Sequence, residues 1–240
     1  MKTLIPYIFD GPFGRFTNAF SSWKPFDTNL INTKTWSQLT IITYNVYFHG
    51  SGFVRFPFVL ELIKSHSPDI VAIQECTHNF LELLMNDKDI KEHFVLSHTT
   101  SKLWNTWYGV VLLVKRDLNV KQMGTLEYQN TRMGRECLFV EIDINGKRFA
   151  LATSHFESGF TDKDKRKEQW EIATTFLKNF DLKVLCGDFN VQTDDTEESL
   201  FLGNLGWEDT WVSGHKIGQA AAGGFTFGKF NLENNDGVMK

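Results

Sequence analysis

Cysteine is scarce in this 240-residue sequence, which contains only Cys76, Cys137 and Cys186. Three is an odd number and none of them stands in a C-x-x-C pair, so a disulfide framework and a structural zinc site are both disfavoured. Each cysteine lies in or beside an apolar run. We therefore expect buried free thiols in a protein that folds in a reducing compartment.

Long apolar runs are also missing, and none approaches the length needed to cross a membrane. The apolar stretch near the start is interrupted by Pro6 and closed by Asp10, which leaves it too short for the hydrophobic region of a secretory signal. These absences predict a soluble intracellular protein of the nucleus or cytoplasm. They give no sign of a membrane segment or of an obligate protein partner.

An excess of positive charge is the third absence. The 25 Lys and Arg stand against 29 Asp and Glu, which gives a net charge of −4. Such a chain has no overall attraction to nucleic acid. Binding to DNA or RNA would have to rest on a local cationic patch or on metal ions that bridge to phosphate.

Aromatic residues, in contrast, are abundant, with 22 Phe and 7 Trp. Many should be buried because they bring the most apolar area per residue to a core, while others can line a pocket or stack on bases. The 42% hydrophobic and 22% charged content is typical of a globular protein. No segment reads as a linker, so we expect an irregular N-terminal extension over residues 1–38 and one domain over residues 39–240.

Hydrophobic periodicity predicts strands interleaved with helices. Strands are expected at residues 39–48, 70–75, 94–97, 108–114, 118–123, 137–144, 147–156 and 182–186. Helices are expected at residues 53–66, 79–85 and 162–180, and around residues 196–202. Asn145-Gly146, between two of the strands, is the strongest two-residue hairpin signal in the chain.

Four of the predicted strands end in polar groups that can do chemistry. These groups are Asn45, Glu75, His155, and the pair Asp188 and Asn190 in G-D-F-N. Each alone has a structural explanation, such as a turn, a solvated strand end or a half-buried histidine. Strand ends gather at one rim of a layered fold, where such folds place their sites, so the recurrence predicts a shared pocket.

The residue types favour a phosphate ester as substrate. Glu75 and Asp188 are hard oxygen donors that suit Mg²⁺, or Mn²⁺ in its place. The sequence has no zinc ligand spacing, no G-x-x-x-x-G-K-S/T loop and no G-x-S-x-G elbow, which disfavours zinc hydrolysis, P-loop chemistry and acyl transfer. Asn and His can donate to a phosphoryl oxygen, and Asp188 can accept the proton of a water. We therefore predict metal-assisted hydrolysis.

The ordered motifs T-Y-N-V, P-D-I-V-A-I-Q-E, A-T-S-H-F-E-S and G-D-F-N resemble the endonuclease/exonuclease/phosphatase superfamily. The resemblance runs from about residue 39 to residue 227. It implies a four-layer α/β sandwich, with two packed β-sheets flanked by helices, and a divalent-metal phosphohydrolase. The stretch R-M-G-R-E-C-L-F-V through T-S-H-F-E-S looks most like the tyrosyl-DNA phosphodiesterases that act on 5′ ends in DNA repair.

The resemblance also implies a role for each motif residue. Asn45 would bind the scissile phosphate, Glu75 would hold Mg²⁺, and His155 would donate to a phosphate oxygen. Asp188 would accept the proton of the attacking water, and Asn190 would orient Asp188.

Four further residues would meet the DNA 5′ end. They are Tyr108, Glu157, Ser158 and Phe227, the last of which would pack on a nucleotide. For Tyr108 and Phe227, core packing explains the aromatic residue equally well.

The sequence departs from the family pattern at three places. Tyr47 stands where the family often has an acid, and Val191-Gln192 stands where the tyrosyl-DNA enzymes carry an Arg that meets DNA. The R-x-D and S-D-H motifs expected after the G-x-T-x segment do not occur before Lys240. A chain without them would lack strands and a transition-state donor, so we expect residues 1–240 alone to be weakly active or inactive and prone to aggregation.

Two alternatives remain open at this point. One is another phosphodiesterase, nuclease or phosphatase of the superfamily, acting on RNA tails, abasic DNA, sphingomyelin or inositol phosphates. The other is a non-catalytic nucleic-acid-binding relative, which the missing terminal motifs favour and the retained acid and base residues oppose.

Overall fold

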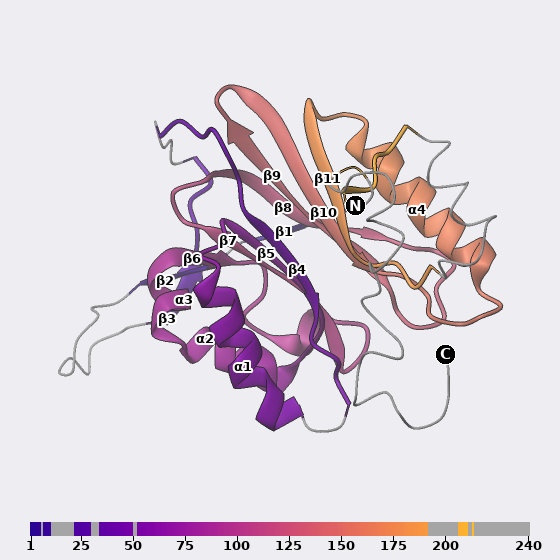
Figure 1. The fold of residues 1–240 in the computed structure, drawn as a ribbon, viewed down its shortest axis with the longest axis horizontal. Helices are drawn as coiled ribbons and strands as arrows, with labels where there is room; N and C mark the ends of the chain where they lie inside the picture. The colour runs from indigo at the N-terminus through magenta and orange to yellow at the C-terminus, as the bar shows by residue number, and fades with distance from the viewer. Residues whose placement is uncertain are drawn as a thin grey trace. The chain divides into compact units, whose positions relative to one another are not determined.

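A computed structural model describes residues 1–5, 7–10, 22–29, 34–49, 52–191, 206–210 and 213 of the chain (Figure 1). The chain divides into two compact units, Met1–Asn190 and Val191–Lys240. All helices, strands and contacts discussed below lie in the first unit. The helix predicted around residues 196–202 falls outside the described residues.

Two β-sheets form the centre of the first unit. The six-stranded sheet has the order β3 (Ser22–Pro25), β2 (Tyr7–Asp10), β6 (Phe94–Leu96), β7 (Tyr108–Lys115), β5 (Ile70–Thr77) and β4 (Ile41–Asn45). The five-stranded sheet has the order β1 (Lys2–Leu4), β8 (Asn119–Glu127), β9 (Glu136–Ile144), β10 (Lys147–His155) and β11 (Leu182–Asp188).

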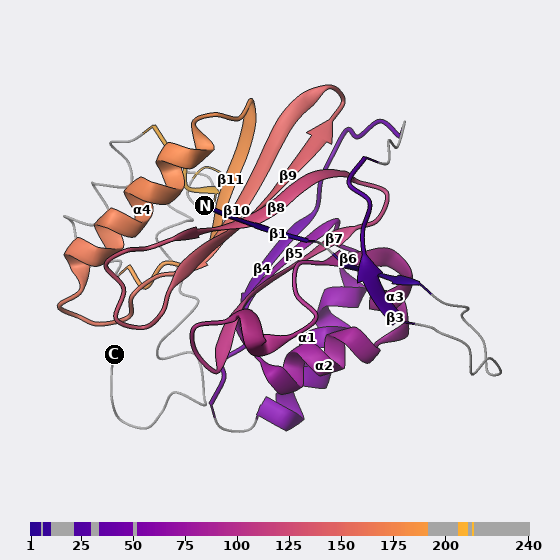
Figure 2. The same ribbon diagram turned by 180° about the vertical axis from the view of Figure 1, so that it is seen from behind.

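Helices cover the outer faces of both sheets, as Figures 1 and 2 show. The six-stranded sheet carries α1 (Gly52–Ser65), α2 (His78–Asn86) and α3 (Lys88–His93), and the five-stranded sheet carries α4 (Lys163–Leu177). A short 3₁₀ turn, Ser101–Leu103, precedes β7. The predicted four-layer α/β sandwich is confirmed. Within the described residues, no helix is long and apolar enough to cross a membrane.

Strand β5 shows why the central strands carry continuous apolar runs. Its side chains alternate, so that Val71 and Ile73 pack among the helices while Ile70 and Ala72 pack against the other sheet. All four are fully buried. A strand that is covered on both faces needs apolar residues at every position, and burial of each large one stabilises the fold by about 1.5–3 kcal/mol.

The N-terminal segment differs from the expected irregular extension. Strand β1 pairs with β8, with Lys2 opposite Thr125, and β2 lies between β3 and β6. These strands have three or four residues, which is too short for a period of two to stand out in the sequence. Their pairing depends on distant partners, so the expectation of irregular structure there was wrong.

Helix α3 was also not predicted. Asp87 caps it, with Oδ1 accepting hydrogen bonds from the backbone N–H groups of Asp89 (2.9 Å) and Ile90 (3.0 Å). A six-residue helix shows little apolar periodicity, so the aspartate cap was its clearest sequence signal.

The hairpin at Asn145-Gly146 is confirmed. Both residues have positive φ, 55° and 80°, as a type I′ turn requires. The turn pairs β9 with β10 so that Lys147 stands opposite Ile144. It thereby starts the strand that ends at His155.

The topology brings four strand ends to one rim. Strand β4 runs parallel to β5, and β10 runs parallel to β11, with His155 opposite Asp188. Strand β11 also contacts β4 and β5 of the other sheet. The carboxyl ends of strands from both sheets therefore meet at the same edge (Figure 1).

Candidate active site

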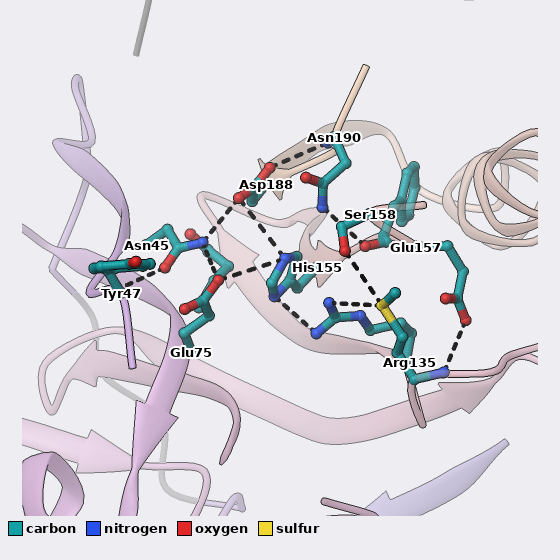
Figure 3. Close-up of polar contacts among 12 residues, drawn as sticks. Asn45, Tyr47, Glu75, Arg135, His155, Glu157, Ser158, Asp188 and Asn190 are labelled. Carbon is teal, nitrogen blue, oxygen red and sulfur yellow. Dashed lines mark hydrogen bonds and ion pairs between the residues drawn. The ribbon is translucent and has the colours of Figure 1, made fainter. Parts of the chain in front are cut away.

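The polar residues predicted at the strand ends lie together at this rim, as Figure 3 shows. Asn45 ends β4, His155 ends β10 and Asp188 ends β11. Glu75 lies within β5, two residues before its end, and Asn190 follows β11. The structure thus brings all five side chains into one cluster drawn from both sheets.

The carboxamide of Asn45 holds the two carboxylates close to each other. Its Nδ2 donates to Glu75 Oε1 (2.9 Å) and to Asp188 Oδ2 (2.8 Å). Its Oδ1 accepts from the backbone N–H of Tyr47 (2.8 Å), which fixes the orientation of the amide. One neutral side chain therefore connects the acidic groups of two different sheets.

A β-bulge directs Glu75 into the cluster. The register of β5 against β7 shifts between Ile73 and Cys76, and Glu75 has a φ of 56°. This left-handed conformation costs roughly 1–2 kcal/mol for a residue with a side chain. The carboxylate gains a backbone hydrogen bond in return, because Phe48 N–H donates to its Oε2 (2.9 Å).

Glycine is required directly before Asp188. Gly187 has a φ of 135°, and a Cβ at this position would lie 2.0 Å from the carbonyl oxygen of Ser154. After the strand, Asn190 N–H donates to Asp188 Oδ1 (3.1 Å), and Asn190 Nδ2 donates to the carbonyl of Phe156 (3.0 Å). The G-D-F-N sequence thus forms the turn that is the structural explanation of such a motif. The turn also orients the Asp188 carboxylate.

Arg135 sets the tautomer of His155. The Arg135 Nη1 lies 2.9 Å from His155 Nδ1, and a guanidinium can only donate, so Nδ1 accepts. The hydrogen of the neutral ring is therefore on Nε2. This atom faces the carboxylates, at 3.7 Å from Glu75 Oε1 and 3.7 Å from Asp188 Oδ2.

His155 is neutral at physiological pH. Burial lowers its pKa well below the usual value, and the Arg135 charge lowers it further, while Asp188 opposes the shift. The ring is thus an N–H donor that does not neutralise the nearby acids.

The cluster fits a divalent cation. The possible ligand atoms of Glu75, His155 and Asp188 all lie within 4.8 Å of one another. Among the described residues, no Lys or Arg pairs with Glu75 or Asp188, and their hydrogen-bond donors are neutral amides. Two carboxylates without a compensating charge favour Mg²⁺ or a similar cation. Nε2 of His155 carries a hydrogen, so the two carboxylates are the better ligands.

Gln74 connects the strands beneath the cluster. Its buried Nε2 donates to Thr43 Oγ1 (3.1 Å) on β4 and to Thr153 Oγ1 (3.0 Å) on β10. Thr43 and Thr153 each precede a cluster residue by two positions, so they lie on the same strand face as Asn45 and His155. Gln74 thereby ties together the three strands that carry Asn45, Glu75 and His155.

Two of the residues expected at the DNA 5′ end lie near the cluster. The Tyr108 ring is 6.3 Å from the His155 ring, and its hydroxyl accepts from Arg135 Nη1 (3.2 Å). Ser158 is exposed, and its Oγ lies 3.3 Å from Met133 Sδ. Phe227 falls outside the described residues.

Glu157 lies elsewhere than expected. Its side chain is fully buried, and Oε1 accepts hydrogen bonds from Thr131 Oγ1 and from the backbone N–H groups of Arg132 and Met133. It anchors the loop that carries Arg135, so the expectation that it borders substrate is corrected to a structural role. Its place in H-F-E-S could not reveal this, because its partners are about 25 residues away in sequence.

Arg135 itself was not among the predicted site residues. It lies in R-M-G-R-E, before β9, and reaches His155 only through the antiparallel pairing of β9 with β10. The available signal was a cationic residue shortly before the apolar run of residues 137–140.

The chain belongs to the Endonuclease/Exonuclease/phosphatase family. The model of that family matches residues 42–237, which include the whole cluster. The family assignment expected from the strand-end motifs is confirmed.

The relatives in this family include several named Tyrosyl-DNA phosphodiesterase 2. The rat protein is 25% identical over 168 residues, and the mouse protein is 24% identical over 180 residues. These matches cover 66% and 73% of this chain but 43% of each relative. The chain therefore spans less than half the length of these curated relatives.

Several solved structures share the fold. A humanized D. rerio TDP2 superposes with a TM-score of 0.59 at 19% identity, covering 71% of this chain and 72% of that chain. ANGEL2, a 2′,3′-cyclic phosphatase, gives 0.57 at 15% identity, covering 69% and 57%. A mannosyl-6-phosphatase of Bacteroides thetaiotaomicron gives 0.54 at 20% identity, covering 70% and 71%. At these identities the likeness concerns the fold alone.

Proposed function

We propose that the chain is a metal-dependent phosphodiesterase that hydrolyses the 5′-phosphotyrosyl bond of DNA–protein adducts in DNA repair. The proposal of hydrolysis rests on one observation. The carboxylates of Glu75 and Asp188 are held by one amide and face an imidazole N–H. An uncompensated acidic pair beside a neutral donor suits a cation and an anionic phosphate together.

Glu75 would hold Mg²⁺ or Mn²⁺, with Asp188 as its nearest acidic neighbour. When bound, the cation would supply positive charge to the phosphate oxygens. It would also relieve the repulsion between the two carboxylates.

Asp188 would accept the proton of the attacking water. Its Oδ1 is held by Asn190 N–H and its Oδ2 by Asn45 Nδ2, so the carboxylate is fixed before substrate arrives. A preoriented base loses little free energy to reorganisation during the reaction.

Asn45 and His155 would donate to the phosphate. His155 Nε2–H has no partner within 3.5 Å among the described residues, so it is ready to meet a phosphoryl oxygen. Both amide hydrogens of Asn45 are engaged with carboxylates. Binding of phosphate by Asn45 would therefore release one of these bonds, and a cation on Glu75 would favour that release.

The choice of a 5′-phosphotyrosyl substrate rests on the relatives. The curated matches are named Tyrosyl-DNA phosphodiesterase 2, and one structural neighbour is D. rerio TDP2 complexed with a single strand DNA product (TM-score 0.59, 19% identity). Tyr108 and Ser158, beside the cluster, would border the DNA end.

The test is release of tyrosine from a 5′-phosphotyrosyl oligonucleotide by the purified chain. Because weak activity is expected of residues 1–240 alone, we expect slow turnover with Mg²⁺, none with EDTA, and a fall to background in Asp188→Asn and Glu75→Gln. A control variant, Asp143→Asn near the end of β9, should keep the activity of the unchanged chain. Turnover that persists in EDTA would contradict the proposal.

A second candidate is a phosphatase of the same family, because ANGEL2 and the mannosyl-6-phosphatase share the fold almost as closely. A panel with 2′,3′-cyclic nucleotide, sugar phosphate, inositol phosphate and sphingomyelin distinguishes the two. Preference for any of these over the phosphotyrosyl oligonucleotide would replace the proposed substrate and keep the reaction class.

A further inference from the structure

Glu157 carries a buried charge that the proposed reaction does not use. It follows His155 by two positions, and Figure 3 shows its carboxylate turned away from Glu75 and Asp188. The side chain is fully buried, and among the described residues its Oε2 has no hydrogen-bond partner. Its Oε1 accepts from one hydroxyl and two backbone N–H groups, all of them neutral. A buried carboxylate with neutral partners destabilises a fold, so a neutral side chain would anchor the loop more favourably.

A carboxylate differs from a neutral anchor in the direction of the hydrogen bonds that it permits. It can only accept, so the Thr131 hydroxyl has to donate its single hydrogen to Glu157 Oε1 (2.6 Å). The lone pairs of Thr131 Oγ1 then point elsewhere, and the backbone N–H of Arg135 donates to this oxygen (2.8 Å). The Glu157 charge thereby fixes the direction of the hydroxyl that holds Arg135.

Arg135 continues this series of hydrogen bonds to the imidazole. Its Nη1 lies 2.9 Å from His155 Nδ1, which places the hydrogen of the neutral ring on Nε2. An unbroken series therefore runs from Glu157 through Thr131 and Arg135 to His155. It starts and ends on the same short segment, residues 155–157, so the imidazole and its support are connected both through the chain and through hydrogen bonds.

The same carboxylate holds the rest of the loop before β9. The backbone N–H groups of Arg132 (2.6 Å) and Met133 (3.1 Å) also donate to Glu157 Oε1. Met133 in turn supports the guanidinium, because Arg135 Nη2 donates to Met133 Sδ (3.4 Å). Hydrogen bonds to a charged acceptor are stronger than those between neutral groups, so one acid fixes Arg135 at its backbone and at its side chain.

Helix α4 fixes Glu157 from the opposite direction. Gln169 Oε1 accepts from Glu157 N–H (3.1 Å), and Arg166 Nη1 donates to the Glu157 carbonyl (3.1 Å). Gln169 and Arg166 are both buried. The backbone of Glu157 is thus attached to the outer helix while its side chain is attached to the loop, which makes it a fixed point for Arg135.

We propose that Glu157 is a positioning residue of the reaction, which acts through Thr131 and Arg135 on the imidazole of His155. This inference rests on the proposed function, because it assigns Glu157 to the phosphate donor of that site. A donor stabilises a transition state most when it is oriented before the substrate binds. Loss of the series should therefore lower kcat and leave KM nearly unchanged.

The first test removes the middle of the series. Thr131→Val deletes the hydroxyl and leaves the bonds of Glu157 to the backbone of the loop in place. We expect kcat to fall about fivefold relative to the unchanged chain, with KM nearly the same. Nitrogen NMR should show part of the His155 rings with the hydrogen on Nδ1. Thr131→Ser restores a hydroxyl and should recover most of the kcat and the Nε2 tautomer.

A second variant tests the charge itself. The amide of Glu157→Gln can donate as well as accept, so it no longer fixes the direction of the Thr131 hydroxyl. We expect a fall in kcat in the same direction and the same change of tautomer. The double variant with Thr131→Val should lose less than the product of the two single losses, because both changes act on one series. Losses that multiply in full would contradict the inference.

The matched control is Thr174→Val in α4, which makes the same chemical change elsewhere. Thr174 is buried, and its Oγ1 donates to the Trp170 carbonyl (2.7 Å). Urea unfolding should show a loss of stability, with kcat and the His155 tautomer unchanged. If Thr131→Val gives this same result, Glu157 only stabilises the loop and the inference is overturned.

The NMR measurement separates this inference from the proposed reaction, because it uses the free protein in EDTA without substrate. A change of tautomer in Thr131→Val and Glu157→Gln supports the positioning of His155 even if the phosphotyrosyl oligonucleotide is not cleaved. An unchanged tautomer together with an unchanged kcat rejects it even if the oligonucleotide is cleaved.

Discussion

At Asp188 a single side chain combines a cost in stability with a proposed function. Its carboxylate and that of Glu75 share the Asn45 amide, and within the described part of the chain no cationic side chain pairs with either. Two like charges in such proximity repel each other, so the folded state is less stable without a cation than with one.

Replacing Asp188 with Asn should therefore remove activity and raise thermal stability in EDTA. We expect an increase in Tm of about 2–4 °C, the shift that about 1 kcal/mol gives in a protein of this size. Mg²⁺ should raise the Tm of the wild type and leave that of the variant nearly unchanged. Differential scanning calorimetry with and without Mg²⁺ measures both effects. A lower Tm for Asp188→Asn in EDTA would contradict the repulsion argument.

Arg135 acts on His155 without facing the carboxylates. Arg135→Met should allow the His155 hydrogen to move to Nδ1 and should raise the pKa of His155, because a cation beside the ring is removed. We expect a ten- to hundredfold fall in kcat with little change in KM, and loss of activity on the acid side at higher pH than in the wild type. Nitrogen NMR of the imidazole reports the tautomer. Arg132→Gln, on the same loop but paired with Asp162, should preserve the tautomer and the pH profile.

At the scale of the element, the turn after β11 depends on Gly187. Gly187→Ala places a Cβ 2.0 Å from the Ser154 carbonyl in a backbone conformation with positive φ. We expect destabilisation of about 3 kcal/mol or more, with loss of activity because Asp188 moves. Gly146→Ala has a positive φ of 80° but nothing within 4 Å, so it should lose only about 1 kcal/mol. Urea unfolding of the two variants separates steric overlap from backbone strain, and equal losses would contradict this account.

The elements also show which features a sequence can predict. The buried runs of β5 and β7 and the Asn145-Gly146 hairpin were predictable because their signals are local. The strands β1 to β3 were not, since three- and four-residue strands are defined by partners far away in the chain.

The same distinction applies to the site. The strand-end positions of Asn45, His155 and Asp188 were evident from the apolar runs before them. The bulge at Glu75 and the contact of Arg135 with His155 were not, because they depend on the register of neighbouring strands. Sequence periodicity identifies which side chains reach a rim, and pairing decides how they meet there.

At the scale of the whole molecule, the buried His98 makes the free energy of unfolding decrease in acid. Burial lowers its pKa to about 4 from the ordinary 6.5, with a smaller effect from Lys2. The unfolded chain then binds more protons than the folded chain between these values, so stability is complete above pH 6.5 and falls as the pH drops toward 4. The loss should reach about 3 kcal/mol.

Glu136 acts in the opposite sense. Burial raises its pKa to about 7, so its contribution to the free energy of unfolding is present below pH 4.5 and is lost as the pH rises through 7.

Urea unfolding at pH 7 and pH 5 tests the contribution of His98. The free energy of unfolding should fall less on acidification in His98→Asn than in the wild type. An unchanged loss in that variant would exclude His98 as its source.

The Asn45 bridge has a consequence for how the molecule opens. Strands β4 and β11 are the outermost strands of their sheets within the described residues, and Asn45 and Asp188 link them. Fraying of either strand breaks this link, and fraying of β11 also separates Asp188 from Glu75. Glu75 lies on β5, next to β4, so a cation held by both acids would connect the edge strand β11 to the other sheet. Amide hydrogen exchange in β11 should therefore slow in Mg²⁺, while that in β9 stays the same.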